Sequence, residues 1–303
     1  MPVSVPCICN TVADFQFANS AILSDSGGVN LNLQTFDYAS EVLQAQNSLD
    51  VECVAGVRSP LYAFLRVAAS VAPFALKKVR ITTNVISSDG ELNSLANNQN
   101  GVGGSWYNTI QGQFYSGALA GLRETSRYTY ATNTSDRLTV LQVGRGFCAA
   151  AGNKDFSVVA GGVTAGTTGI SSTERHVLSE STWRTGTALA VNRAAMNNGA
   201  SNLSVCLFAG GYGTVASAAA ALSTTDRYTI ATDARVAGAA LGLATGSMGV
   251  ASGAAYGLLA GGLSAYITGT QRTAINKYNF AGNSFAVSAT SIAASANLNR
   301  WAV

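Results

Sequence analysis

Short apolar segments that end in glycine recur four times in the last two-thirds of the chain. Each is followed by a segment in which large and polar side chains alternate, as they do along a strand whose two faces differ. The glycine-ending segments read GALAGL (117–122), SVVAGGV (157–163), CLFAGGY (206–212) and GLLAGGL (257–263). The alternating segments read TSRYTYAT (125–132), TERHVLSE (173–180), TDRYTIAT (225–232) and INKYNFAG (275–282). A strand-built repeat of about 50 residues predicts stacked or radially arranged sheets.

The four copies stay in phase. The central aromatic of the alternating segment lies at positions 128, 176, 228 and 278, at intervals of 48, 52 and 50 residues. A basic residue always precedes it, and we expect this basic-aromatic pair to brace adjacent sheets. Residues that tolerate tight turns follow, so we predict turns near Asn133, Ser181, Asp233 and Asn283. Residues 106–303 should therefore be almost entirely β.

The first third of the chain differs from the rest. All four prolines lie in the first quarter, and a linker rich in Asn and Gly (NSLANNQNGVGG) occupies 93–104. This shift predicts two parts, an N-terminal β-rich attachment module at 1–104 and a repeat array at 105–303. Because Gly27-Gly28 and TFDYAS (35–40) faintly echo the repeats, degenerate blades in 1–104 remain an alternative.

The last copy stops at 298–303, where earlier copies enter a further strand. This ending predicts a missing strand and an open C-terminal edge. A segment before the array, such as 106–119, or a neighbouring subunit would then complete the last sheet.

The repeat spacing resembles the kelch motif, in which a Gly-Gly strand end is followed by an aromatic residue and then by Trp. The fullest copy has Gly161, Gly162, His176 and Trp183, whereas the first departs, with Ala120-Gly121 and only seven residues to Tyr128. The resemblance implies a kelch-like β-propeller of four-stranded blades, about four of them recognisable. Glycines at the end of an inner strand would let neighbouring strands or blades approach closely, because no Cβ intervenes. We expect such contacts at Gly161, Gly162, Gly210, Gly211, Gly261 and Gly262.

Composition excludes several classes of partner. Only 11% of the 303 residues are charged, the net charge is +3, and the largest basic cluster is Lys77-Lys78-Val79-Arg80, so we expect no nucleic-acid binding. The longest apolar stretch, 61–76, contains Arg66 and Pro73, which argues against a membrane span. The five cysteines form no CxxC pair, and Cys148 and Cys206 are expected to be buried, reduced thiols. With no secretory signal at the N-terminus, these features indicate assembly in a reducing cytoplasm.

Candidate chemistry is sparse. His176 is the single histidine and occupies the aromatic position of its repeat, so we interpret it as a packing residue. One histidine cannot provide the two imidazole ligands and tyrosines of the kelch-type copper oxidases, and no GxSxG elbow or zinc-type cluster is present. Glu174 and Asp226 directly precede Arg175 and Arg227 and are expected to form structural ion pairs. The sequence predicts no enzyme, no cofactor and no metal.

The array is charge-poor and rich in small residues, and it is similar to the kelch-like proteins of tailed bacteriophages, whose repeats read like LFAGGY…TTDRYTIATD at 207–233. This resemblance implies a non-enzymatic virion structural protein, a tail or fibre component that binds other virion proteins, copies of itself and a host-surface glycan. The alternatives are a cellular kelch-type adaptor or carbohydrate-binding lectin and, third, a propeller hydrolase or lyase. The apolar residues expected to make assembly contacts are Phe15, Phe17, Leu61, Phe64, Phe74 and Trp301.

Overall fold

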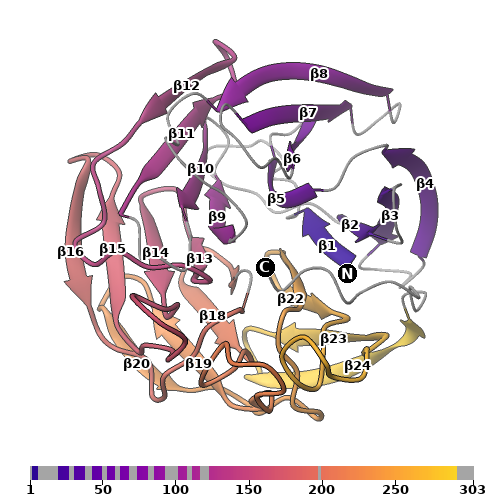
Figure 1. Ribbon diagram of the computed structural model, residues 1–303, viewed down its shortest axis with the longest axis vertical. Coiled ribbons are helices and arrows are strands. Elements are labelled where there is room, and N and C mark those ends of the chain that lie inside the picture. Colours follow the sequence, from indigo (N-terminus) through magenta and orange to yellow (C-terminus); the bar gives the residue numbers. More distant parts are fainter. Residues whose placement is uncertain are drawn as a thin grey trace.

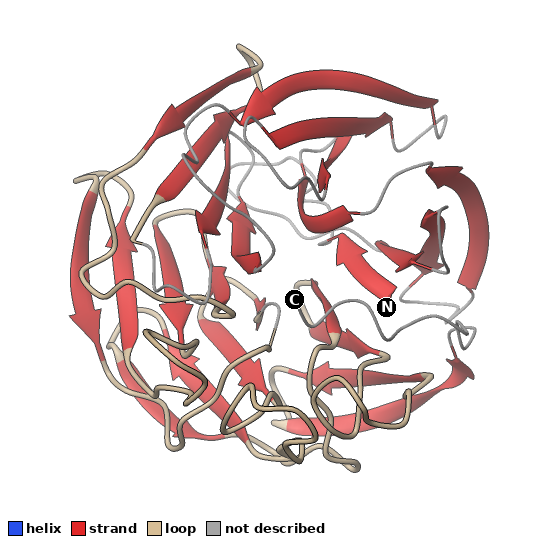
Figure 2. Ribbon diagram, viewed as in Figure 1, coloured by secondary structure: helices blue, strands red, loops and turns tan. Residues whose placement is uncertain are grey.

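The described chain consists of strands, turns and loops, and the computed structural model contains no helix among the described residues (Figure 2). The backbone is described for the strands between residues 2 and 116, and for 123–196 and 199–291. Side chains are described for 111–113, 115, 123–196, 199–288 and 291. The prediction of an all-β protein is confirmed.

The described strands form six antiparallel sheets of four strands each. The first two sheets consist of β1 (Pro2–Val5), β2 (Ser20–Ser26), β3 (Leu31–Asp37) and β4 (Leu43–Leu49), then β5 (Cys53–Arg58), β6 (Tyr62–Val67), β7 (Phe74–Arg80) and β8 (Val85–Leu92). The third and fourth consist of β9 (Val102–Tyr107), β10 (Gln111–Ser116), β11 (Thr125–Thr129) and β12 (Thr134–Arg137), then β13 (Ala149–Gly152), β14 (Phe156–Ala160), β15 (Thr173–Val177) and β16 (Thr182–Gly186). The last two consist of β17 (Ala200–Ser201), β18 (Val205–Ala209), β19 (Thr225–Thr229) and β20 (Ala234–Ala237), then β21 (Gly249–Ser252), β22 (Tyr256–Ala260), β23 (Ala274–Asn279) and β24 (Ser284–Ser291).

The six sheets are arranged in a ring (Figure 1). Within each sheet the strands follow chain order, from a first strand near the centre of the ring to a fourth at its rim. The first strand of every sheet contacts the first strand of the next, and β21 contacts β1. The first and the sixth sheet are thus neighbours, and they meet at the contact between β1 and β21.

Three of the glycine-ending segments contain the second strands of their sheets, β14, β18 and β22, and not the inner strands, whereas 117–122 lies outside the described residues. The alternating segments contain the third strands. The sixth sheet has all four strands. The predicted missing strand is therefore wrong, because the repeat was counted from its second strand. Trp106 lies in β9, the first strand of the third sheet, and does not complete the sixth.

The N-terminal strands follow the same pattern as the repeats. β1–β4 and β5–β8 form two sheets in the same strand order as the later four. β9 crosses the predicted boundary at 104/105, because it begins at Val102 and belongs to the third sheet. The division into an attachment module and a repeat array stays a prediction.

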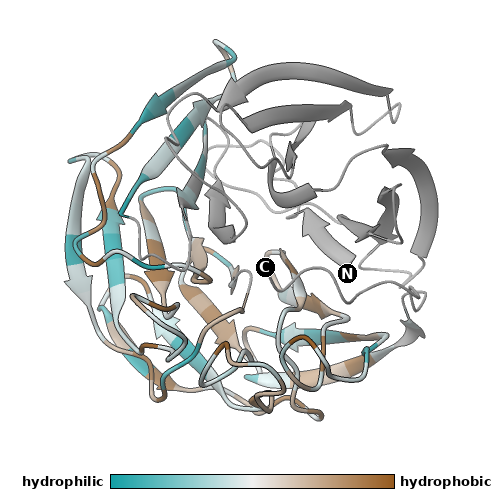
Figure 3. Cartoon of the chain, in the orientation of Figure 1, coloured by the Kyte–Doolittle hydropathy of each residue, from teal (hydrophilic) through white to brown (hydrophobic). Residues whose placement is uncertain are grey.

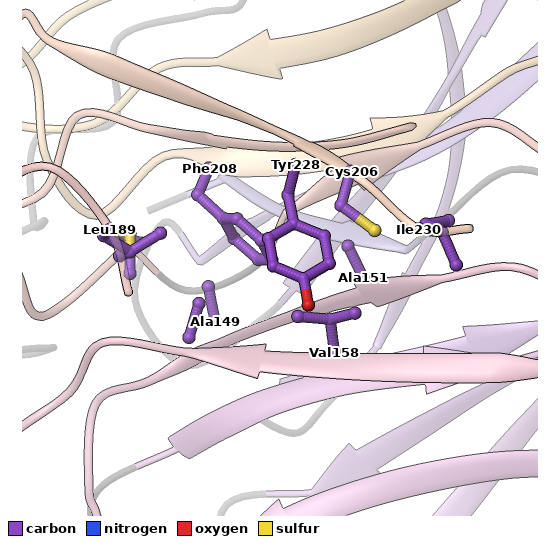
Figure 4. Close-up of a cluster of buried hydrophobic side chains, with 10 residues drawn as sticks. Ala149, Ala151, Val158, Leu189, Cys206, Phe208, Tyr228 and Ile230 are labelled. Carbon is purple, nitrogen blue, oxygen red and sulfur yellow. The ribbon is translucent and has the colours of Figure 1, made fainter. Parts of the chain in front are cut away.

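The core lies between neighbouring sheets. One cluster joins Ala149, Ala151 and Val158 of the fourth sheet to Phe208 and Tyr228 of the fifth (Figure 4). A second cluster joins the fifth and sixth sheets in the same way. Figure 3 shows the corresponding pattern, with apolar residues concentrated on β14 and β18. The small side chains of Ala149 and Ala151 on β13 leave room for Phe208 and Tyr228 at this boundary.

The predicted turns are confirmed. In the last four sheets the third strand is joined to the fourth by four residues, and the last of these has a left-handed backbone, with φ of 54° at Asn133, 52° at Ser181, 53° at Asp233 and 46° at Asn283. Asn and Asp tolerate this conformation better than most residues.

The repeat aromatic supports the turn and the neighbouring sheet together. The Tyr278 hydroxyl donates to Asn283 Oδ1 at 2.7 Å, and the same oxygen accepts the amide of Ala239 of the preceding sheet at 3.0 Å. Tyr228 and Asp233 repeat the arrangement, with the amide of Thr187 donating to Asp233 at 2.9 Å. The expected bracing of adjacent sheets is thus confirmed for the aromatic.

The glycine prediction is also confirmed at Gly161, Gly162, Gly210, Gly211 and Gly262, where an added Cβ would lie 2.0–2.7 Å from a neighbouring atom. A Cβ on Gly162 would lie 2.5 Å from the carbonyl oxygen of Gly146, and one on Gly210 would lie 2.0 Å from that of Thr245. Both carbonyls belong to the linkers that enter first strands. The glycines therefore permit contact between the end of a second strand and a linker.

Candidate functional site

The boundary between the third and fourth sheets departs from the repeat at four positions. Gln113 and Tyr115 of β10 meet Ser157 of β14 and His176 of β15 across this boundary. The corresponding residues are Val158, Ala160, Cys206 and Tyr228 between the fourth and fifth sheets, and Leu207, Ala209, Gly257 and Tyr278 between the fifth and sixth. These positions are mainly apolar at the other two boundaries whose side chains are described. Between the third and fourth sheets they form a buried polar cluster.

Hydrogen bonds connect the four side chains. The Tyr115 hydroxyl lies 2.7 Å from Ser157 Oγ and 2.8 Å from Gln113 Oε1, and the Ser157 hydroxyl donates to Gln113 Oε1 at 3.2 Å. The Gln113 oxygen is thus directed at the two hydroxyls, and its amide nitrogen faces His176 Nδ1 at 3.4 Å. Burial raises the pKa of Tyr115 well above its usual range, so this phenol stays protonated.

His176 is held rigidly and is neutral. Its ring stacks on Trp183, with centroids 4.7 Å apart and planes inclined by 23°. Burial and, to a smaller extent, the positive charge of Arg127 together lower the pKa of His176 to about 4. With Nδ1 accepting from Gln113, the ring hydrogen is on Nε2. This Nε2 is buried and finds no hydrogen-bond partner among the described residues.

A pocket of about 280 Å³ lies at this boundary. From the third sheet it is lined by Gln111, Gln113, Arg127 and Leu138, and from the fourth by Lys154, Asp155, His176, Leu178, Ser179 and Ser181. Its charged residues are two cations, Arg127 and Lys154, and one carboxylate, Asp155. Lys154 Nζ lies 3.3 Å from Asp155 Oδ1, and Arg127 Nη2 lies 3.0 Å from Asp136 Oδ2 outside the pocket. The pocket is thus polar, and each of its two cations is paired with a carboxylate.

Glu174 and Asp226 form structural ion pairs, as predicted, but their partners are different. Arg145 Nη2 donates to Glu174 Oε1 at 2.7 Å, and Arg193 Nη2 donates to Asp226 Oδ2 at 2.8 Å, with all four side chains buried. Arg175, in contrast, lies with Cζ 3.7 Å from the centre of the Phe156 ring.

Each buried guanidinium also fixes the base of a loop. Arg145 Nη1 donates to the carbonyls of Gly161 and Ser172, at 3.0 and 2.8 Å, which are the two ends of the loop between β14 and β15. Arg193 donates in the same way to the carbonyls of Gly210 and Thr224. These carboxylates are therefore engaged in structural bonds within the fold.

The sequence prediction missed Arg145 and Arg193 and the polar cluster. An alignment of the repeats contains both signals. The sixth sheet has Thr245 and Asn276 at the positions of Arg193 and Asp226, so the two charges disappear together. The four polar residues between the third and fourth sheets also stand out in this alignment, once it is known which strands face each other.

Most of the predicted assembly residues lie outside the described residues. Phe15, Phe17, Leu61 and Trp301 lie outside the described residues. Phe64 and Phe74 lie in β6 and β7, paired in register with Lys78 and Leu92, and their side chains are not described.

The expectations for cysteines and membrane spans can be compared with the described residues. Cys148 and Cys206 are buried and form no disulfide, as expected. No described helix has the length and apolarity needed to cross a membrane. Within the described residues, no three His, Cys, Asp or Glu side chains are grouped so as to hold a metal ion.

Comparison with known proteins yields similarity of fold alone. No family model and no curated protein matches the chain. Among solved structures, the chain is similar to YjhT with a TM-score of 0.70 and 9% sequence identity, over 95% of this chain and 99% of that one. At this identity the likeness concerns the arrangement of the strands and carries no residue roles.

Proposed function

We propose that this protein is a kelch-like β-propeller that serves as a non-enzymatic structural component of a virion, in the tail or fibre of a bacteriophage. The single observation that supports a structural role is the use of the recurring polar residues. The repeat tyrosines, the turn residues and the two buried ion pairs bond one part of the ring to another. The placement in a phage tail rests on the resemblance of the repeats.

In this proposal all six sheets are blades. The support is that the first strands contact each other in cyclic order and that β21 contacts β1. The N-terminal two blades would then be degenerate in sequence and would carry the attachment surface, through residues such as Phe64 and Phe74. Other virion proteins and further copies of this chain are the proposed partners, with assembly in the host cytoplasm.

The experiment is quantitative mass spectrometry of purified particles. A structural component is present in a fixed number of copies per particle and stays with the particle after a high-salt wash. A protein recovered only as a soluble monomer from the host lysate would support the adaptor or lectin alternative instead. Because deletion of 1–90 would remove two sheets of the ring, attachment is better tested by single substitutions such as Phe64→Ala, followed by the same particle assay.

A further inference from the structure

At the pocket between the third and fourth sheets, two buried N–H groups have no hydrogen-bond acceptor among the described residues. His176 Nε2 and Arg127 Nε are both buried and have no hydrogen-bond partner among the described residues. Both residues line the pocket, and the His176 side chain is 1% exposed. A buried donor without an acceptor destabilises the folded state, because it has lost its hydrogen bonds to water. Two of them at one pocket indicate a site that is completed by an acceptor.

The neighbours of His176 determine which of its ring nitrogens carries the hydrogen. Gln113 Oε1 receives the hydroxyls of Tyr115 and Ser157, so the amide nitrogen of Gln113 faces Nδ1 and the ring hydrogen lies on Nε2. The stack on Trp183 fixes the ring plane. The residues at the same positions between the fifth and sixth sheets, Leu207, Gly257 and Tyr278, could not build this arrangement.

From these observations we infer that the pocket binds a small oxyanion, a carboxylate, sulfate or phosphate group, through His176 Nε2–H, Arg127 and Lys154. Arg127 and Lys154 place two cationic groups at the pocket, and each also pairs with a carboxylate, Asp136 and Asp155. Both ion pairs are partly exposed and therefore weak, so either cation can also bind an oxyanion. Charge-assisted hydrogen bonds to an oxyanion are also stronger than those to a neutral oxygen. The volume of about 280 Å³ lies at the lower end of ligand pockets, so the ligand is small or is one group of a longer chain. This inference goes beyond the virion role and does not depend on it.

His176 provides a direct probe, because it is the only histidine in the chain. The imidazole resonances of the full-length protein are followed by NMR while sodium sulfate, sodium phosphate or sodium acetate is added to about 50 mM, a range that covers millimolar affinity. Sodium chloride at matched ionic strength is the blank. We expect a saturable shift of the His176 Nε2–H signal with at least one of the three oxyanions.

Variants assign the site. Lys154→Gln changes an exposed side chain and should weaken binding without affecting the fold. Arg127→Leu should weaken it at least about tenfold, as loss of a charge-assisted hydrogen bond does. The matched control is Arg227→Leu, at the same repeat position two sheets away, which should leave affinity unchanged.

Two further ligands separate the sources of the anion. If dextran sulfate shifts His176 while free ions do not, the oxyanion is recognised as part of a polymer, which agrees with the inference. If unsulfated dextran produces the same shift, the pocket is a site for neutral hydroxyls and the inference is wrong. It is also wrong if no oxyanion or polymer shifts His176, or if Arg127→Leu and Arg227→Leu weaken binding equally.

Discussion

Gly210 offers the sharpest test of how the sheets are packed. It follows β18 with φ of +64°, and a Cβ there would lie 2.0 Å from the carbonyl oxygen of Thr245 and 2.9 Å from Met248 Cε. That carbonyl cannot easily move, because it accepts the amide of Gly211 at 3.1 Å. Gly210→Ala therefore combines a left-handed backbone, about 1–2 kcal/mol, with overpacking, about 1–3 kcal/mol. We expect a loss of about 2–5 kcal/mol in the free energy of unfolding.

Two other glycines separate the cost of the left-handed backbone from the cost of overpacking. Gly166 has φ of +76°, and a Cβ added there would have no atom within 4 Å, so Gly166→Ala should cost only about 1–2 kcal/mol. Gly242 has neither a left-handed φ nor a close neighbour, and Gly242→Ala should stay within about 0.5 kcal/mol of the parent. Urea unfolding followed by tryptophan fluorescence gives all three values. Equal losses for Gly210→Ala and Gly166→Ala would refute the close contact between β18 and the linker.

Three further predictions follow from the polar contacts. Arg193→Leu should destabilise by at most about 3–5 kcal/mol, because the buried Asp226 loses its closer partner and keeps only Arg235, at 3.4 Å. Arg193→Thr with Asp226→Asn, the residues of the sixth sheet, should cost less than the sum of the single changes in a double-mutant cycle. His176 should titrate near pH 4 by NMR. Since an unfolded histidine titrates near pH 6.5, the contribution of His176 to the free energy of unfolding is complete above about pH 6.5 and falls by about 2–3 kcal/mol towards pH 4. His176→Phe should make the free energy of unfolding less dependent on pH in this range. Tyr278→Phe should cost about 1 kcal/mol through loss of its bond to Asn283, and a melting curve identical to that of the parent would show that this bond contributes nothing.

The strands and turns of the repeats were predictable because residues close together in the sequence determine them. Alternation across the third strand and the turn residue at Asn283 lie within a few positions of each other. The place of a strand within its sheet is not local. β14 is buried on both faces, as an inner strand would be, so its sequence does not distinguish a second strand from a first.

The candidate site could not be predicted for a related reason. Arginine is usually exposed, and Arg193 meets Asp226 from 33 residues away. The cluster around His176 joins residues from two sheets, with Gln113 lying 63 positions earlier. Each departure is minor within its own strand, and the four form a site only when the sheets pack against each other.

The central claim is a ring that is closed by contact between the first and the last sheet. Hydrogen exchange measured by mass spectrometry tests it directly, with the full chain compared to a variant that lacks residues 2–5 (β1). β21 (Gly249–Ser252) contacts β1, whereas β13 (Ala149–Gly152) contacts β9 and β17. Removal of β1 should therefore accelerate exchange at β21 and leave β13 unchanged, even though β21 lies at the other end of the sequence. Unaltered exchange at β21 would contradict a closed ring.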